Sequence, residues 1–302
     1  MELSSGCAKR LIPIPPANNV GIIEQTIRLN GIGKMRETGC WLKFTSALAE
    51  EFQVDNFRLN HYPVEDFYKS QWQTRERSFW YLLYRWCVAL FYLGSILACA
   101  IHQFDNARFF IYLTDWGFVL CTIATLYGAV LTTLWHFDRV DALEDSWGIK
   151  LFWILHWSAL VLSIVISSMF WTLLLQVDPS IAGDPYNLLQ HATNSIVMII
   201  DHFVVRFPSR ILHFIYPLGI GAVYCLFSII YYFAGGTGAY GASNSIYPIL
   251  DWGGSPLIAC LSVLTAVLAC FIFSFILFWL YKLRVYLCRT FSNTQKPHTI
   301  HY

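Results

Sequence analysis

The sequence predicts an all-α polytopic membrane protein, built as a bundle of six transmembrane helices with both termini in the cytoplasm. Of its 302 residues, 56% are hydrophobic and only 13% are charged. Soluble domains are closer to one quarter charged, so this composition is typical of membrane proteins. The net charge of +1 gives no reason to expect a nucleic-acid partner.

Six stretches are apolar for long enough to cross a bilayer, which takes roughly 20 helical residues. They cover 79–101, 109–134, 151–175, 187–205, 211–233 and 257–281. The fourth is the least apolar, because it contains several polar side chains. A five-span arrangement, in which the fourth stretch is only re-entrant, is therefore the alternative.

Basic residues favour six spans, because they occur in alternate segments, as the positive-inside rule predicts. Arg85, in the first turns of the first span, is expected to snorkel toward the same side. The opposite connections hold Arg108 alone. The basic segments are the stretch before the first span (Lys69, Arg75, Arg77), the second loop (Arg139, Lys150), the fourth loop (Arg206, Arg210) and the tail (Lys282, Arg284, Arg289).

This topology divides the chain into three parts. Residues 1–78 are expected to form a cytosolic N-terminal arm, and residues 79–281 the six-helix transmembrane domain. Residues 282–302 are expected to form a cytosolic tail. The loop between the last two spans, 235–255, is rich in glycine and aromatic residues, and we expect it to cover the mouth of the bundle.

The fourth span carries His191, Asn194, Asp201 and His202 on one helical face. Ionisable groups at membrane depth are costly and usually mark a site facing the protein interior. Thr114-Asp115 lies at a similar depth in the second span, so that these residues and His191 can meet inside the bundle. Asp201 and His202 lie deeper and precede two arginines of the fourth loop, which favours a structural ion pair; a proton path along this helix is the alternative.

Thr114 and His191 allow a chemical hypothesis. A neutral imidazole can remove the proton of a threonine hydroxyl and so make it a nucleophile. Asp115 can orient the imidazole, and Asn194 can donate a hydrogen bond to an oxyanion. The alternative is a buried polar network of His191, Asn194 and Asp115 that fixes the register of the helices.

Sequence patterns for other chemistry are absent. The chain contains no EF-hand, P-loop, GxSxG, HExxH or dinucleotide-binding pattern, and its nine cysteines show no metal-ligand spacing. We therefore expect no cofactor and no metal. A transporter or channel ranks lowest among the possible functions, because the sequence has no internal repeat.

Five strings together resemble a known family in order and spacing. They are Phe67-Tyr-Lys-Ser-Gln-Trp72, Tyr112-Leu-Thr-Asp-Trp-Gly117, Asn187-Leu-Leu-Gln-His-Ala-Thr-Asn194, Arg206-Phe-Pro-Ser-Arg210 and Tyr247-Pro-Ile-Leu-Asp-Trp252. The family is that of rolling stone, multi-pass proteins associated with myoblast fusion during muscle development. The resemblance runs from about Phe67 into the last span, and the first 60 residues fall outside it.

The rolling stone family is in turn distantly similar to the androgen-induced membrane hydrolases, which cleave fatty-acid esters of hydroxy fatty acids with an intramembrane threonine and histidine. This similarity implies Thr114 and His191 as the corresponding residues, although Asp115-Trp116 departs from the Leu-Thr-Phe context of those enzymes. The resemblance implies a plasma-membrane protein acting in cell fusion or muscle development through lipid handling, with the endoplasmic reticulum as the alternative compartment. A lipid-ester hydrolase is the second hypothesis. The expected partners are membrane lipids, including an acyl-lipid substrate.

Overall fold

The structure, a computed structural model, describes residues 45–46, 48–103, 108–139, 147–174, 183–238 and 245–294. The chain divides into two compact units, Met1–Gln53 and Val54–Tyr302. In the first unit, residues 48–51 are helical. Most of the predicted arm and the last eight residues of the predicted tail lie outside the described residues. All that follows concerns the second unit.

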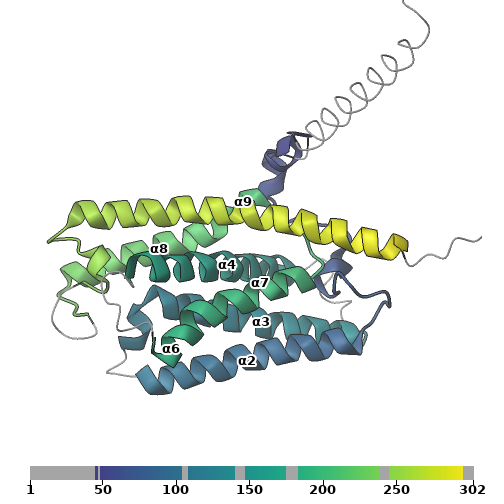
Figure 1. The fold of residues 1–302 in the computed structure, drawn as a ribbon, viewed down its shortest axis with the longest axis horizontal. Helices are drawn as coiled ribbons and strands as arrows, with labels where there is room; N and C mark the ends of the chain where they lie inside the picture. The colour runs from purple at the N-terminus through teal and green to yellow at the C-terminus, as the bar shows by residue number, and fades with distance from the viewer. Residues whose placement is uncertain are drawn as a thin grey trace, which may run out of the picture. The chain divides into compact units, whose positions relative to one another are not determined.

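The second unit is helical, and its described residues contain no strand beyond an isolated bridge between Ser70 and Val205. The α-helices are α2 (Phe79–Gln103), α3 (Leu113–His136), α4 (Trp147–Met169), α6 (Pro185–Asn187), α7 (Asn194–Val204), α8 (Ile215–Phe233) and α9 (Pro256–Thr294). Short 3-10 turns are η1 (Val54–Phe57), η2 (Val64–Phe67), η3 (Arg108–Ile111), η7 (Ile211–Phe214) and η8 (Pro248–Leu250). Two π-helical segments, η4 (Phe170–Leu174) and η6 (Leu188–Thr193), continue α4 and join α6 to α7. Figure 1 shows the arrangement.

Five helices among the described residues are long and apolar enough to cross a membrane, at 79–102, 113–136, 147–173, 211–233 and 256–292. They coincide with five of the six predicted spans. The predicted fourth span instead consists of α6, η6 and α7 in succession, helical from Pro185 to Val204. The last helix is longer than predicted, because residues 282–294 contain neither Gly nor Pro to end it.

The helical segments alternate in direction. At one end of the unit, the hydroxyl of Ser70 donates to the carbonyl of Val204, and the Trp72 indole donates to Phe203. At the other end, the His102 ring stacks on Tyr186 with centroids 3.8 Å apart, and Gln190 donates to Asp115. The start of α2 and the end of α7 are therefore neighbours, as are the end of α2 and the start of α6 (Figure 1).

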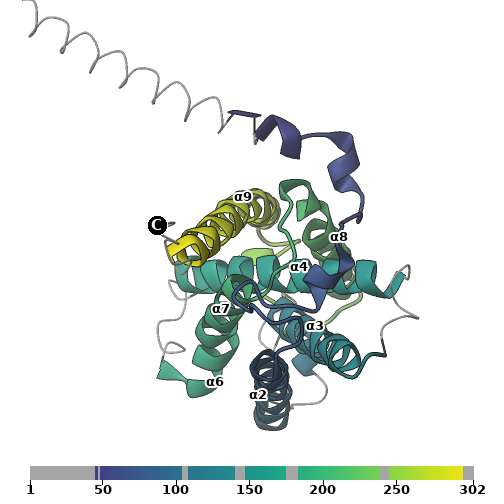
Figure 2. The ribbon, with the colours of Figure 1, turned by 90° about the vertical axis from the view of Figure 1, so that its right-hand side faces the viewer.

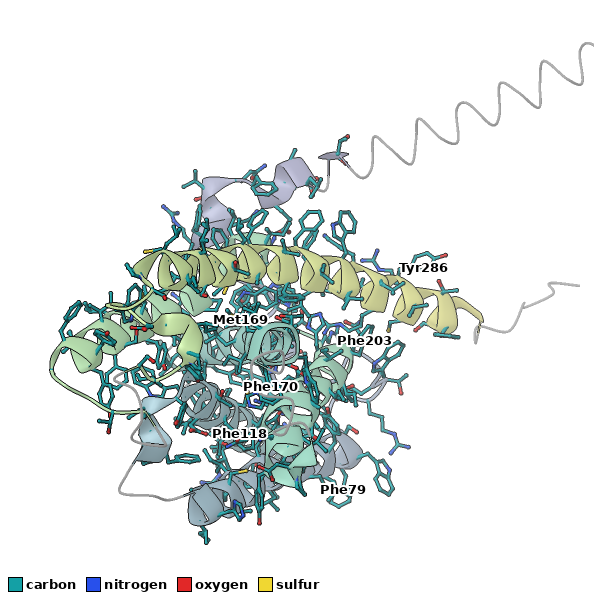
Figure 3. All side chains as sticks on the ribbon, turned by 60° about the vertical axis from the view of Figure 1, so that its left-hand side comes forward. Phe79, Phe118, Met169, Phe170, Phe203 and Tyr286 are labelled. Carbon is teal, nitrogen blue, oxygen red and sulfur yellow. The ribbon has the colours of Figure 1, made fainter. Side chains whose placement is uncertain are left out.

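The helix α4 is central, because it contacts α3, α7, α8 and α9. Figure 2 shows α8 and α9 on one side of α4, and α2, α3 and α7 on the other. Side chains such as Phe118 and Phe170 are buried between the helices, whereas Phe79 and Tyr286 are exposed on the outside (Figure 3). The site described next lies beside α4.

Candidate functional site: an apolar cavity with a polar end

A cavity of about 390 Å³ lies between α4, α8 and α9. Its helical lining is Leu162, Val165, Ile166 and Met169 from α4; Leu218, Gly221, Ala222, Tyr224, Cys225, Leu226, Ser228 and Ile229 from α8; and Ser262, Val263, Ala266, Val267 and Cys270 from α9. Leu113, Thr114, His191, Tyr247, Ile249 and Leu250 complete it. At about 1.5 Å per residue, the stretch from Ser262 to Cys270 covers about 12 Å along α9.

Small residues in the sequences of α8 and α9 explain why a cavity forms between the helices. The positions 218, 221, 222, 225 and 229 recur at helical spacing, so that they form one face of α8. Gly221 and Ala222 on this face, together with Ala266 on α9, are too small to fill the space between the helices. A Cβ added to Gly221 would meet no atom within 4 Å. This small-residue pattern was the signal that the sequence analysis missed.

The polar groups of the cavity gather at one end. Thr114 is at the start of α3, His191 lies in η6, and Tyr247 lies in the connection between α8 and α9. Thr114 is 7% exposed and His191 is 5% exposed. Thr114 and His191, which the sequence analysis singled out, therefore both line this cavity.

His191 is held by two π-helical segments that the sequence did not indicate. It lies in η6, and its ring stacks on Phe170 of η4 with centroids 3.7 Å apart and planes 8° from parallel. Nδ1 of His191 is buried and has no hydrogen-bond partner among the described residues. Single-turn π-helices inside α-helices are frequent at functional sites, because they turn a side chain out of its regular position.

Asp115 and Asn194 do not line the cavity. Asp115 accepts a hydrogen bond from Nε2 of Gln190 at 3.0 Å rather than from His191. This bond links the residue after Thr114 to the residue before His191, so that it positions the two indirectly. The backbone carbonyl of Asn194 accepts from Tyr92 at 2.8 Å, and its side-chain oxygen is buried without a partner.

Tyr247 closes the polar end of the cavity. Its side chain is hydrogen bonded to Thr114 and to Tyr224, and the Tyr224 hydroxyl donates to the carbonyl of Ile111 at 2.9 Å. Burial raises the pKa of Tyr247 above its usual value, so that its hydroxyl stays protonated. The connection is also docked on α8, because the Trp252 indole donates to the Ser228 hydroxyl at 3.2 Å.

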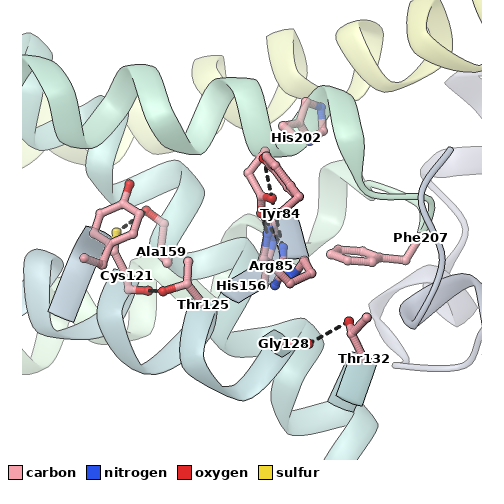
Figure 4. A network of polar contacts seen from close by, with 12 residues as sticks. Tyr84, Arg85, Cys121, Thr125, Gly128, Thr132, His156, Ala159, His202 and Phe207 are labelled. Carbon is pink, nitrogen blue, oxygen red and sulfur yellow. Dashed lines mark hydrogen bonds and ion pairs between the residues drawn. The ribbon is translucent and has the colours of Figure 1, made fainter. Parts of the chain in front are cut away.

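Asp201 belongs to a second, separate cluster, drawn in Figure 4. Its carboxylate accepts two hydrogen bonds from Nη1 of Arg85, at 2.8 and 2.9 Å, and one from the Tyr84 hydroxyl at 3.0 Å. Nε2 of His156 lies 2.7 Å from Oδ2 of Asp201. The ionic groups are almost completely buried, Arg85 and His156 at 1% and Asp201 at 0% exposure.

This cluster corrects two expectations. Arg85 does not snorkel to the surface, because Asp201 provides a counter-charge inside the bundle. Asp201 does pair with an arginine, but the partner comes from α2 and not from the loop after α7. Arg206 of that loop pairs instead with Asp66, at 2.7 Å.

His202 and Arg284 connect α7 to α9. Nε2 of His202 lies 3.0 Å from the carbonyl oxygen of Leu277. The guanidinium of Arg284, which is fully buried, donates to the carbonyls of His202, Arg206 and Phe207. Arg284 thus satisfies backbone oxygens at the end of α7 that have no partner within the helix. Its role is structural.

Within the part of the chain that the structure describes, no group of three or more His, Cys, Asp or Glu side chains could hold a metal ion. The polar side chains that line the cavity carry hydroxyl groups, thiols and one imidazole.

The fold and the cavity define an all-α, multi-pass membrane protein with an apolar cavity and a separate buried ion cluster. A family model described as "Protein rolling stone" matches residues 40–302. The chain belongs to the rolling stone family. A relative from Drosophila melanogaster, "Protein rolling stone", is 38% identical over 268 residues, covering 85% of this chain and 97% of that protein.

The family match begins before the resemblance seen in the sequence strings, since it includes residues 40–60. No solved structure matches this chain.

Proposed function

We propose that this protein binds the acyl chain of a membrane lipid in the cavity between α4, α8 and α9, and that its action in cell fusion or muscle development, which the family resemblance implies, depends on this lipid. The observation that carries the proposal is the cavity itself. Ala222 and Leu226 both line it and are exposed on the outer surface of α8. An acyl chain can therefore enter sideways from the membrane without crossing water.

We propose that the protein lies in the plasma membrane with six spans and both termini in the cytoplasm. The run of helix from Pro185 to Val204 contains about 20 residues and rises about 30 Å, which matches the apolar thickness of a bilayer. The neighbouring positions of Ser70 and Val204 support a sixth crossing, because they bring the end of α7 back to the side on which α2 begins.

The test fills the cavity with a side chain. Gly221→Phe places a ring where the structure has open space. We expect labelling by a photoreactive acyl lipid in nanodiscs to fall about tenfold, because the ring competes for the volume of the chain. Labelling is measured by mass spectrometry of the purified full-length protein.

Gly219→Phe is the matched control. An added Cβ at Gly219 also meets no atom within 4 Å, but this residue is exposed and does not line the cavity. The two variants change helix propensity equally. Equal labelling of both variants, each folded as the unmodified protein is, would contradict the proposal.

A lipid-ester hydrolase is a second candidate, favoured by Thr114 and His191 both lining the cavity. Oγ of Thr114 would form a bond to the ester carbonyl carbon while His191 takes the hydroxyl proton. The bond from that carbon to the alcohol oxygen would then break, and His191 would return the proton to the leaving alcohol. Water would hydrolyse the acyl-threonine by the same route, which releases the fatty acid and restores both residues.

The hydrolase is tested with a fluorophosphonate probe. We expect labelling that is lost in Thr114→Val and in His191→Ala but retained in Thr265→Val, a matched change at an exposed position of α9. Labelling that persists in Thr114→Val would rule out Thr114 as the nucleophile. Lipid binding can remain in that case, so the two candidates are separated.

A further inference from the structure

The charge of the cavity wall limits what its ligand can be. Among the described residues, no Lys, Arg, Asp or Glu lines the cavity, and His191 is its single ionisable side chain other than tyrosine and cysteine. An ion transferred into such a wall loses its hydration and finds no counter-charge, which costs several kcal/mol at least. A neutral polar group needs only a hydrogen-bond partner.

The polar end offers such partners. Tyr224 uses its single proton on the carbonyl of Ile111, so its hydrogen bond with Tyr247 must be donated by Tyr247. The proton of Tyr247 is then occupied, so its bond with Thr114 must be donated by Thr114. The three hydroxyls form one chain that ends on the backbone, and an incoming carbonyl oxygen can share the proton of Thr114 or Tyr247 in a three-centre hydrogen bond.

The buried Nδ1 atom of His191 is an independent sign that a ligand belongs here. The residue is 5% exposed and lines the cavity, and this nitrogen has no partner among the described residues. Buried polar atoms are nearly always hydrogen bonded in the functional state of a protein.

We infer that the cavity selects an uncharged acyl ester over lipids with an ionised headgroup, and that the Tyr247 hydroxyl, together with Thr114, holds the ester carbonyl at the polar end. The inference rests on the proposed function and specifies its ligand. The alkyl chain of the ester lies along α4, α8 and α9, between small and aliphatic side chains. From the connection between α8 and α9, Tyr247, Ile249 and Leu250 line the cavity beside the ester group.

The experiment compares three competitors with the same saturated chain: a methyl ester, an alkyl sulfonate that stays anionic, and the alkane. Each displaces a photoreactive acyl ester from the full-length protein in nanodiscs, at equal mole fraction in the bilayer. We expect the ester to compete about three- to tenfold better than the alkane, the effect of one net hydrogen bond. The sulfonate should compete at least about tenfold less well than the ester.

Tyr247→Phe removes one hydroxyl and keeps the ring. We expect it to abolish the preference for the ester over the alkane while leaving competition by the alkane unchanged. Tyr231→Phe is the matched control, because its hydroxyl donates to Thr237 and it does not line the cavity. Thr114→Val provides a second test of the hydroxyl chain if Tyr247→Phe does not fold.

The outcomes separate this inference from the proposed function. If the sulfonate competes as well as the ester, or if Tyr247→Phe and Thr114→Val both keep the ester preference, the inference is wrong. Labelling that stays sensitive to Gly221→Phe would still support acyl binding in that case. If labelling by the photoreactive ester is insensitive to Gly221→Phe, the proposed function fails as well.

Discussion

Asp201 is held by side chains of two other helices, because its carboxylate is fully buried and contacts a guanidinium, an imidazole and a phenol. The Arg85 and Asp201 charges cancel, so the cluster as a whole can be buried although neither ion can be buried alone. Asp201 lies in α7, and its partners come from α2 and α4. The cluster therefore fixes how these three helices are rotated relative to one another.

We predict that Asp201→Asn destabilises the protein by about 3–5 kcal/mol, because it leaves the Arg85 guanidinium buried without a counter-charge. Asp138→Asn is the matched control. Asp138 forms a close pair with Arg77 at 2.6 Å, but the two side chains are 73% and 38% exposed. That pair should contribute no more than about 1 kcal/mol. Chemical unfolding of both variants in detergent measures the difference, and similar losses would show that the buried cluster is not specially stabilising.

Gly128 is required by the same cluster. A Cβ at this position would overlap Nη2 of Arg85 and lie 3.0 Å from Cε2 of Phe152. We predict that Gly128→Ala displaces the guanidinium and destabilises the protein by about 1–3 kcal/mol. Gly94→Ala, on the exposed face of α2 with no atom within 4 Å of the new methyl, should be neutral or slightly stabilising. An equal effect of both changes on the unfolding midpoint would contradict this explanation.

At this scale the sequence identified polar residues that the structure buries, but it did not identify their partners. Thr114, His191 and Asp201 stood out because polar groups in apolar spans are costly. Spacing along one helix fixes the face on which a residue lies, but not which helix that face meets. Asp201 was therefore assigned to arginines close in sequence, whereas its partner Arg85 is more than a hundred residues away.

At the scale of elements, hydropathy located five of the spans, and the predicted bounds 211–233 agree with the helical stretch that the structure shows. The two π-helical segments were not predictable, because their extra residue per turn is determined by packing rather than by a local sequence signal. They determine where His191 and Phe170 point. The detailed geometry of the candidate site therefore depends on the part of the fold that the sequence reveals least.

The connection between α8 and α9 is held by Asp251. The backbone N–H of Gly254 donates to Oδ1 of Asp251 at 2.8 Å, and the Tyr232 hydroxyl also contacts it. These donors lower the pKa of Asp251 below its ordinary value of 3.8. Because the pKa of Asp251 is lowered in the folded state, its ionised carboxylate stabilises the connection fully at pH values above the ordinary pKa. This stabilisation is lost as the pH falls through the lowered pKa of the folded state.

We predict that the amide of Gly254 loses protection from hydrogen exchange as the pH falls below about 4, through the lowered pKa of Asp251. Expressing the result as a protection factor removes the pH dependence of the intrinsic exchange rate. Asp251→Asn cannot titrate and should show a low protection factor that does not change over this range. A loss of the same size in the variant would assign the effect to another group.

At the scale of the whole molecule, three segments lie together at one end of the bundle: the start of α2, the end of α7 and the last third of α9. The hydroxyl of Ser70 donates a hydrogen bond to the carbonyl of Val204, and the guanidinium of Arg284 donates one to the carbonyl of Phe207. The thiol of Cys288 donates to the carbonyl of Gln71. These contacts support our proposal that the segments before α2, after α7 and around Cys288 lie on the same side of the membrane. A five-span arrangement separates them.

This leads to a prediction about topology, tested by single cysteines in a chain whose nine native cysteines are replaced. With six spans, a membrane-impermeant maleimide should label Gly183→Cys in intact cells, but should label Arg206→Cys only after permeabilisation. Gly183 is exposed, and its side-chain position is free of other atoms. The Arg206 side chain is 42% exposed.

Arg139→Cys is the control, because it is cytoplasmic in both arrangements. Labelling of this variant in intact cells would show that the maleimide has leaked through the membrane. With five spans and a re-entrant segment 187–205, Arg206→Cys would be labelled from outside together with Gly183→Cys. Because Arg206 follows α7 directly, its labelling decides whether the helix that carries His191 crosses the bilayer.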